Sequence, residues 1–288
     1  LGDIVRPEVG VITNIGDAHI ERLGSRENIF RAKCELLPHI RKENGLLILN
    51  GDDALLSTLR GRTPVPAVFC GSGEGLEYRA QSASSEGLDS LRSRLTTPAM
   101  DREVCIPALG SHMIYPTLIA AAVGEHFGLT ADEIEQGIAR FVPTRMRMNL
   151  VQRGNGITIL DDTYNANPQS MRAAISVLAD SRSAWKLAVL GDMFELGPYS
   201  PALHTGVGEY LGKRKIDCLV AVGDQARYLA EGAQSAGMTA VYPCADKKAA
   251  REILPGLIRP DSTILVKASR GMRMEELVDQ LLELTPEQ

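Results

Sequence analysis

A regular alternation of strand and helix patterns, from Gly156 to the end of the chain, is the feature that most constrains the fold. Short apolar runs suited to buried strands are separated by segments in which apolar residues recur at helical spacing. The expected strands are Ile157–Leu160, Leu187–Leu190, Cys218–Val222, Thr239–Tyr242 and Thr263–Val266. The expected helices lie near 168–179, 200–212, 224–236, 246–254 and 272–284. Because helices between successive strands cover a parallel sheet, we expect a doubly wound α/β domain.

The first half of the chain is less regular. Val9–Ile15 and Leu46–Leu49 indicate parallel-sheet strands on either side of a helix that starts at the capping residue Ser25. Residues 64–107 are rich in Gly, Ser and Pro with short apolar pieces, which favours a small, mostly antiparallel sheet with exposed loops. Residues 112–127 return to a helical pattern.

The length of 288 residues favours two domains, since a domain commonly has roughly 100 to 200 residues. The segment Pro143–Asn149, which carries Arg145 and Arg147, is the expected linker between them. We therefore expect a first domain at residues 1–147 and a second at 148–288.

Composition argues against several classes of protein. The net charge of −5 argues against a general nucleic-acid surface, because such surfaces are basic. Five scattered cysteines without C-x-x-C spacing indicate neither a disulfide framework nor a zinc knuckle, and favour a reducing cytoplasm. No apolar run reaches about 18 residues, so we expect no membrane span. The chain begins with Leu1 close to a strand pattern, as though an upstream part had been removed.

The most chemically informative stretch is ITILDDTYNANPQSM, from Ile157 to Met171. An apolar strand ends in Asp161 and Asp162, and Asn167 followed by Pro168 predicts the start of a helix. Ligands of open α/β sheets collect where strand ends meet helix N-termini. A capped helix after a solvated acidic turn remains the alternative interpretation.

A second polar cluster follows the first expected strand. The stretch TNIGDAHIE places Asn14, Asp17, His19 and Glu21 on one loop, a grouping typical of hard-cation ligands, although a solvent loop with an incidental histidine is also open. Lys33 lies further along in a helix between apolar residues, where a lysine ordinarily extends to solvent.

Two more strand ends carry polar residues. LGDMFELG, at 190–197, has a carboxylate followed by an irregular loop with a glycine at its end. VKASR, at 266–270, brings Lys267, Ser269 and Arg270 just ahead of a helix, where they could clamp a carboxylate or phosphate. Singly, each basic residue is more often a surface charge.

The chain resembles the Mur ligase family in five segments that occur in the family's order. They are ITNIGDAHIERLGSRENIFRAKCEL, GSH at 110–112, DDTYNANPQSM, LGDMFELG and LVKASRGMRMEEL. The resemblance runs essentially end to end. It implies that residues 1–147 are the later part of the family's central ATPase domain, a mixed sheet with helices. Residues 148–288 would be its Rossmann-like C-terminal domain.

The resemblance also implies an activity. The member with YNANP and GDMFELG joins D-alanyl-D-alanine to UDP-N-acetylmuramoyl-tripeptide through an acyl phosphate, with ATP and Mg²⁺ as cofactors. It acts in the cytoplasm, without nucleic acid, and we expect a monomer.

Residue by residue, the resemblance implies the following roles. His19 matches a metal ligand, and Lys33 matches a lysine that becomes carbamylated and so gains oxygen ligands for the metal. On the nucleotide side, His112 matches an adenine contact, Arg147 a phosphate contact, and Asp162 a ribose or nucleotide-loop aspartate with Tyr164, Asn165 and Asn167 around it. Lys267, Ser269 and Arg270 match the segment at the site of the incoming dipeptide.

This chain departs from the wider superfamily at Met113 and Pro116, where asparagine is common. Proline has no N–H, so we expect no amide contact from Pro116 to adenine. No G-x-x-x-x-G-K-[ST] sequence occurs either, so the phosphate cradle is missing and we expect a fragment of a larger ligase.

Two other functions remain open. The first is a non-catalytic α/β binding module that kept the nucleotide-side loops, which the native upstream sequence would distinguish from a ligase fragment. The second, a nicotinamide dehydrogenase, is weaker because no G-x-G-x-x-G follows any expected strand.

Overall fold

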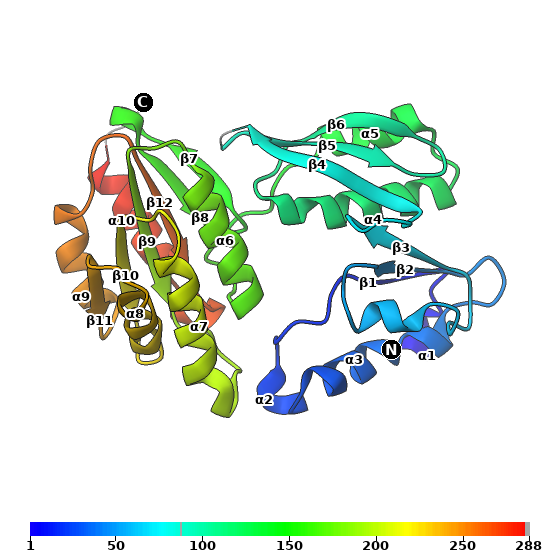
Figure 1. The fold of residues 1–288 in the computed structure, drawn as a ribbon, viewed down its shortest axis with the longest axis horizontal. Coiled ribbons are helices and arrows are strands. Elements are labelled where there is room, and N and C mark those ends of the chain that lie inside the picture. Colours follow the sequence, from blue (N-terminus) through cyan, green and yellow to red (C-terminus); the bar gives the residue numbers. More distant parts are fainter. Residues whose placement is uncertain (87, 286–288) are drawn as a thin grey trace. The chain divides into compact units, whose positions relative to one another are not determined.

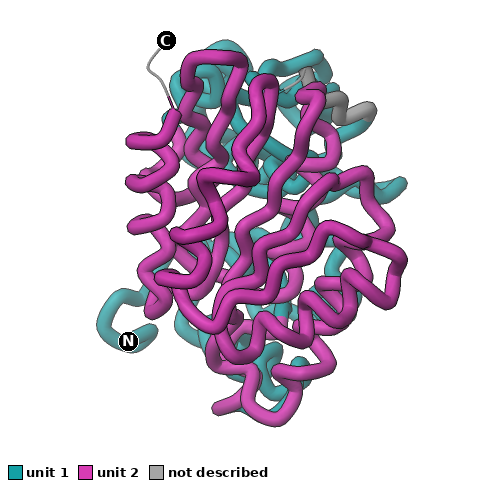
Figure 2. Tube along the Cα trace, turned by 90° about the vertical axis from the view of Figure 1, so that its left-hand side faces the viewer, with its two compact units in different colours: residues 1–16, 23–142 teal, residues 17–22, 143–288 magenta. Residues whose placement is uncertain are grey.

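The computed structural model describes residues 1–86 and 88–285 in two compact units (Figure 2). Unit 1 comprises residues 1–16 and 23–142, and unit 2 comprises 17–22 and 143–288. The expected domain boundary after residue 147 stays a prediction, and the last three residues of that second domain lie outside the described part. Residues 17–22, expected in the first domain, group with unit 2.

Unit 1 is built on one mixed six-stranded sheet with its strands in chain order (Figure 1). The strands are β1 (Val9–Ile12), β2 (Leu46–Asn50), β3 (Ala67–Gly71), β4 (Tyr78–Glu86), β5 (Ser90–Thr96) and β6 (Asp101–Ile106). β1 to β4 pair in parallel, and β4, β5 and β6 pair antiparallel. The prediction of a small, mostly antiparallel sheet at 64–107 is right for β4 to β6, which belong to the same sheet as the parallel strands. β3, which is apolar and largely buried, extends the parallel part beside β2.

Two of the helices of unit 1 begin at side-chain caps. They are α1 (Gly2–Val5), α3 (Arg26–Cys34), α4 (Ile114–His126) and α5 (Ala131–Ala139), while α2 (Ile20–Leu23) crosses the boundary with unit 2. Ser25 caps α3 as predicted, with its Oγ accepting from the Asn28 amide at 3.2 Å. α5 was not predicted, although Thr130 and Glu133 form a capping box. α4 packs on β2, β3 and β4, and α5 on β6, which encloses the core of this unit.

Unit 2 contains a second six-stranded sheet in the order β11-β10-β9-β12-β8-β7. The strands are β7 (Asn149–Gln152), β8 (Thr158–Asp161), β9 (Trp185–Gly191), β10 (Cys218–Val222), β11 (Val241–Cys244) and β12 (Ser262–Lys267). The five strands predicted here are present and parallel, with β11 displaced by two residues. β7 is an unpredicted antiparallel edge strand that begins at the end of the expected linker.

Helices cover both faces of this sheet, as the alternating pattern predicts. α6 (Pro168–Asp180), α7 (Ser200–Gly212) and α8 (Ala226–Ser235) contact one another along one face, and α9 (Lys247–Ile253) and α10 (Glu275–Leu284) contact each other on the other (Figure 1). Gly208 permits the close approach of α7 to α8, because a Cβ there would lie 1.9 Å from the Leu229 carbonyl oxygen. The Rossmann-like fold is thereby confirmed.

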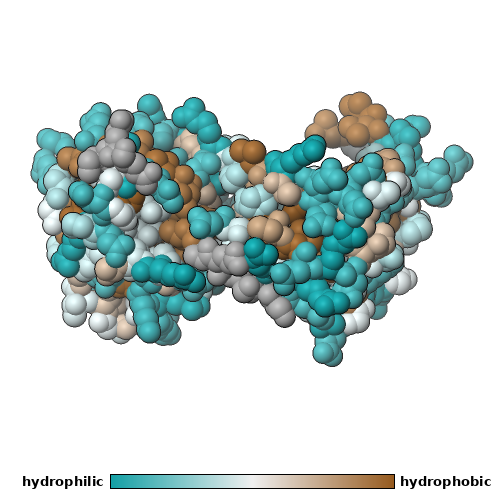
Figure 3. Space-filling view, turned by 90° about the horizontal axis from the view of Figure 1, so that it is seen from above, coloured by the Kyte–Doolittle hydropathy of each residue, from teal (hydrophilic) through white to brown (hydrophobic). Residues whose placement is uncertain are grey.

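The surface seen in Figure 3 is largely hydrophilic, with hydrophobic residues in small groups. Among the described residues, no helix combines the length and apolar character needed to cross a bilayer. All five cysteines are free thiols.

Candidate functional site

The loop between β8 and α6 is held by its own side chains. Asp161 Oδ1 accepts from the Thr163 amide at 3.1 Å and from its hydroxyl at 2.6 Å. Asn167 caps α6 as predicted and exchanges hydrogen bonds with Ser170, while Pro168 takes the first helical position. The side chain of Asn167 is thus already engaged in the helix cap.

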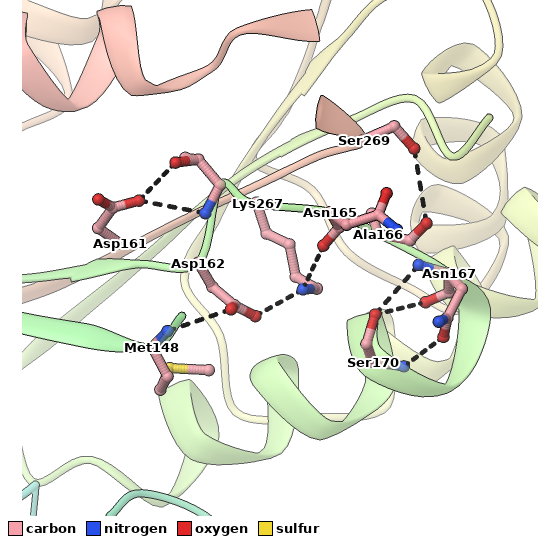
Figure 4. A network of polar contacts seen from close by, with 10 residues as sticks. Met148, Asp161, Asp162, Asn165, Ala166, Asn167, Ser170, Lys267 and Ser269 are labelled. Atoms are coloured by element: carbon pink, nitrogen blue, oxygen red, sulfur yellow. Dashed lines mark hydrogen bonds and ion pairs between the residues drawn. The ribbon is translucent and has the colours of Figure 1, made fainter. Parts of the chain in front are cut away.

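Asp162 forms an ion pair with Lys267, the last residue of β12 (Figure 4). Lys267 Nζ donates to Asp162 Oδ2 at 2.5 Å and to the Asn165 carbonyl oxygen at 2.8 Å. β8 and β12 are adjacent parallel strands, which brings these two residues together at one sheet edge. Lys267 is only 2% exposed, and burial lowers the pKa of its ammonium while the Asp162 carboxylate opposes that change.

The segment just before β7 contacts the same loop. The Met148 amide donates to Asp162 Oδ1 at 3.1 Å, and the Tyr164 amide donates to the Met146 carbonyl oxygen at 3.0 Å. Between them, the Arg147 guanidinium lies 4.1 Å from the centre of the Tyr164 ring. Arg147 and Tyr164 are exposed, so a charged group and a flat ring face solvent beside a buried ion pair. Such a pair of side chains suits a phosphorylated ligand.

Each of the three residues of the predicted carboxylate clamp has a partner within unit 2. Lys267 turns to Asp162, and the buried Ser269 Oγ accepts from the Phe194 amide at 2.8 Å. Arg270 Nη1 donates instead to Glu275 Oε1 at 2.8 Å. Of the three, only Arg270 offers an exposed charge, because Lys267 and Ser269 satisfy polar groups inside the unit, and the clamp stays a prediction.

The loop after β9 contains polar residues that sequence reasoning did not assign to a site. Asp192 is 7% exposed, and burial raises the pKa of its carboxyl although Oδ1 accepts from the Gln225 and Ala226 amides at 3.0 and 2.7 Å. His204 on α7 is fully buried; its Nε2 accepts from the Met193 amide at 2.9 Å. The LGDMFELG pattern was noticed, but its buried histidine partner lies further along the chain.

His19, the predicted metal ligand, lies in the part of unit 2 formed by residues 17–22. It has a left-handed backbone with φ of 64°, and its Nδ1 contacts Glu195 Oε2. The Glu21 amide donates to the Glu195 carbonyl oxygen at 3.1 Å. The structure therefore brings His19 to the LGDMFELG loop, whose Glu195 sequence reasoning had not singled out.

Lys33 lies in unit 1, on α3. Its Nζ donates to the Asn14 carbonyl oxygen at 2.6 Å, beyond the end of β1. Lys33 is an exposed residue, but partial desolvation of its ammonium lowers its pKa, and the nearby Asp53 opposes this. The predicted pair of metal ligands, His19 and Lys33, is thus divided between the two units.

A polar cluster at the ends of β2 and β3 was missed from the sequence. Asp52 Oδ2 accepts from the Ser72 amide at 2.6 Å and from the Tyr115 hydroxyl at 3.1 Å. Burial works against ionisation of Asp52, but these bonds and one from Gly73 outweigh it and lower its pKa. The sequence could have predicted this cluster, because Asp52-Asp53 follows an apolar strand just as Asp161-Asp162 does.

His112, the predicted adenine contact, is an exposed residue of the short 3₁₀ turn Ser111–Met113 that leads into α4. Pro116 lies in the first turn of α4, where its missing N–H is tolerated. His112 therefore lies just before the first turn of α4, in which Tyr115 donates to Asp52.

A magnesium site is not complete in these residues. Mg²⁺ requires oxygen ligands in near-octahedral geometry. In the described part of the chain, no three His, Cys, Asp or Glu side chains group in a way that could hold a metal. An unmodified Lys33 ammonium is a hydrogen-bond donor and cannot serve as a ligand.

Two family descriptions match this chain. The Mur ligase middle domain matches residues 1–124, and the Mur ligase glutamate ligase domain matches 146–270. The UDP-N-acetylmuramoyl-tripeptide–D-alanyl-D-alanine ligase of Bacillus subtilis strain 168 is 35% identical over 98% of this chain and 61% of its own length. The Escherichia coli K12 ligase of the same name is 34% identical over 97% of this chain and 61% of its own.

Solved structures give the same result. MurF from Acinetobacter baumannii superposes with a TM-score of 0.90 at 32% identity, over 98% of this chain and 61% of that one. MurF from Thermotoga maritima, solved in complex with ADP, gives 0.82 at 25% identity, over 96% and 62%. The chain therefore spans about three fifths of the length of these relatives.

Proposed function

This chain belongs to the Mur ligase family, and on that premise we propose that it forms part of an ATP-dependent amide ligase. The proposed reaction joins D-alanyl-D-alanine to UDP-N-acetylmuramoyl-tripeptide in peptidoglycan precursor synthesis. The observation that carries the proposal is the 35% identity, over 98% of the chain, to a relative named for that reaction. A cytoplasmic location is part of the proposal, because ATP and UDP-linked sugars are cytoplasmic metabolites.

The chemistry proceeds in two steps. A carboxylate oxygen of the tripeptide attacks the γ-phosphorus of ATP, which forms an acyl phosphate and releases ADP. The amine of the dipeptide then attacks the acyl carbon, loses a proton, and expels phosphate. Both steps develop negative charge, so catalysis depends on positioned cations and donors.

The proposed nucleotide-binding residues are those that the resemblance implies: His112, Arg147, Asp162, Tyr164, Asn165 and Asn167. The exposed Arg147–Tyr164 stack beside Asp162 supports it, since a guanidinium suits phosphate and an aromatic ring suits a flat group. Asn165 has less support, because Lys267 contacts its backbone carbonyl oxygen and not its side chain. Asn167 contributes through the cap of α6.

We assign the incoming dipeptide's carboxylate to Arg270, whose exposed guanidinium lies just after the end of β12. Lys267 and Ser269 belong to the same strand end, and their buried side chains contact the neighbouring loops of unit 2.

Magnesium enters the proposal through the resemblance, with His19 and a carbamylated Lys33 as its ligands. A bound magnesium ion would neutralise phosphate charge. The lowered pKa of Lys33 supports carbamylation, because only a neutral amine adds to CO₂. Among the residues that the structure describes, the side chains do not form a complete metal site.

Phosphate release by a full-length ligase that contains these residues tests the function. We expect release only when ATP, UDP-N-acetylmuramoyl-tripeptide and D-alanyl-D-alanine are all present, and none from the 288-residue chain alone, which lacks a phosphate-binding loop. Turnover by the chain alone, or full-length activity that does not depend on the dipeptide, contradicts the proposal. Nucleotide binding without any turnover favours the non-catalytic module.

A further inference from the structure

Lys267 is unusual because lysines are rarely buried unless they are paired. It is 2% exposed, and two of its three ammonium donors are used within unit 2, by Asp162 Oδ2 at 2.5 Å and by the Asn165 carbonyl oxygen at 2.8 Å. Figure 4 shows its side chain directed between these two acceptors. A dipeptide could reach this ammonium only by displacing the residues that bury it.

We infer that Lys267 is a positioning residue for Asp162, and through Asp162 for the segment that carries Arg147, and does not itself bind the dipeptide. The inference rests on the proposed function, in which Asp162 and Arg147 contact the nucleotide. It deepens that proposal by moving Lys267 from the dipeptide side of the site to the nucleotide side.

The Asp162 carboxylate connects two elements through its separate oxygens. Oδ2 accepts from Lys267, and Oδ1 accepts from the Met148 amide at 3.1 Å. The Asp162 amide also donates to the Val266 carbonyl oxygen at 3.0 Å, next to Lys267 on β12. The position of this carboxylate is therefore determined by β12 on one side and by the segment before β7 on the other.

That segment needs such support. Met146 and Met148 both have left-handed backbones, with φ of 62° and 50°, a conformation that residues other than glycine adopt rarely and that neighbouring contacts must maintain. Arg147 lies between them, stacked on Tyr164. Loss of the Lys267 charge should release Asp162, and with it the turn that presents the Arg147 guanidinium.

A double-mutant cycle in the full-length ligase tests the inference. The variants are Lys267→Met, Asp162→Asn and the two combined, with Lys186→Met as the matched control. Lys186 is a half-buried lysine of the neighbouring strand β9, and it pairs with Thr263 at the opposite end of β12. Calorimetry gives the affinity for ADP, and phosphate release gives KM for D-alanyl-D-alanine.

We expect Lys267→Met and Asp162→Asn each to weaken ADP binding by about 10- to 100-fold, the range of one charge-assisted hydrogen bond. The combined variant should bind ADP no more weakly than Asp162→Asn alone, because both changes remove one contact. KM for the dipeptide should stay near the wild-type value, whereas a general loss of structure would change both constants. Lys186→Met should change neither.

Three results overturn the inference. If Lys267→Met raises KM for the dipeptide and leaves ADP affinity unchanged, Lys267 binds the substrate carboxylate. If the two losses of ADP affinity add, Lys267 acts independently of Asp162 while the proposed function stands. If Asp162→Asn leaves ADP affinity unchanged, the nucleotide role of Asp162 fails, and the inference with it. If Lys267→Met fails to fold, the combined variant is compared with Asp162→Asn. The combined variant carries no unpaired buried charge. Weaker ADP binding by the combined variant than by Asp162→Asn would overturn the inference.

Discussion

Lys33 illustrates how the surroundings of one side chain can set its chemistry. Carbamylation requires a neutral amine, and an ordinary lysine is almost entirely protonated near neutral pH. Lys33 is exposed, yet partial desolvation of its ammonium lowers its pKa and increases its neutral fraction, while Asp53 works in the opposite direction. The Asn14 carbonyl oxygen, 2.6 Å from Nζ, holds the side chain at the end of β1.

We therefore predict that Lys33→Ala in the full-length ligase lowers the rate of phosphate release by at least ~10²-fold, the scale for one preorganised electrostatic group. A small carboxylate added to the assay should restore part of the rate by replacing the carbamate. Lys42→Ala, which removes an exposed lysine of the same unit, is the control and should leave the rate unchanged. A near-normal rate for Lys33→Ala without any additive would return Lys33 to the class of surface lysines.

Asp162 and Lys267 mark the limit of prediction for single residues. Each was recognised because polar residues follow an apolar strand. Their pairing across 105 positions was not, since it depends on β12 lying next to β8. The chain returns from β11 to insert β12 between β9 and β8, and no local pattern records that insertion. Tyr115 and Asp52 were also missed as partners, because only the fold brings α4 to the end of β2.

At the scale of elements, strong local signals gave correct predictions. α6 was predicted because Asn167 and Pro168 mark its start and apolar residues repeat along it. β7 was missed because four residues at a sheet edge carry too little alternation to distinguish a strand from a linker. The parallel pairing of β3 was missed because its flanks are rich in Gly, Ser and Pro, which read as turns of an antiparallel sheet.

The contact between α7 and the loop after β9 should make unit 2 sensitive to acid. Burial lowers the pKa of His204, whose Nδ1 donates to the Ser200 carbonyl oxygen at 2.8 Å while Nε2 accepts from Met193. Below about pH 6.5 the unfolded chain takes up a proton at this histidine that the folded chain does not. Stability from the neutral His204 is therefore complete above that pH and is lost as the pH falls toward the lowered pKa.

Urea unfolding of the chain at pH 8 to 5, followed by the fluorescence of Trp185, the single tryptophan, measures this effect. His204→Gln keeps an acceptor for the Met193 amide but does not titrate. We expect the wild type to lose up to about 1.4 kcal/mol per pH unit more than the variant below pH 6.5. Above pH 7 the two should depend on pH alike. Equal slopes throughout would mean that His204 does not govern the acid sensitivity.

At the scale of the whole molecule, the two units follow one plan. In each, polar residues gather at the carboxyl ends of parallel strands: Asn14 and Asp52 in unit 1, and Asp162, Asp192 and Lys267 in unit 2. Polar strand ends next to helix N-termini are where α/β sheets bind ligands. Family membership and this plan together support a ligase, while the identity of its substrates comes from the relatives' names.

Oxygen transfer tests the central claim most directly. UDP-N-acetylmuramoyl-tripeptide labelled with ¹⁸O in its terminal carboxylate is incubated with ATP, D-alanyl-D-alanine and the full-length ligase, and the released phosphate is analysed by mass spectrometry. Attack of the carboxylate on ATP, followed by attack of the amine on the acyl phosphate, must leave one carboxylate oxygen in phosphate. We predict one labelled oxygen in each phosphate released, and an amide product that retains the other. Unlabelled phosphate released in step with the amide product would contradict the acyl-phosphate ligase that this chain is proposed to form.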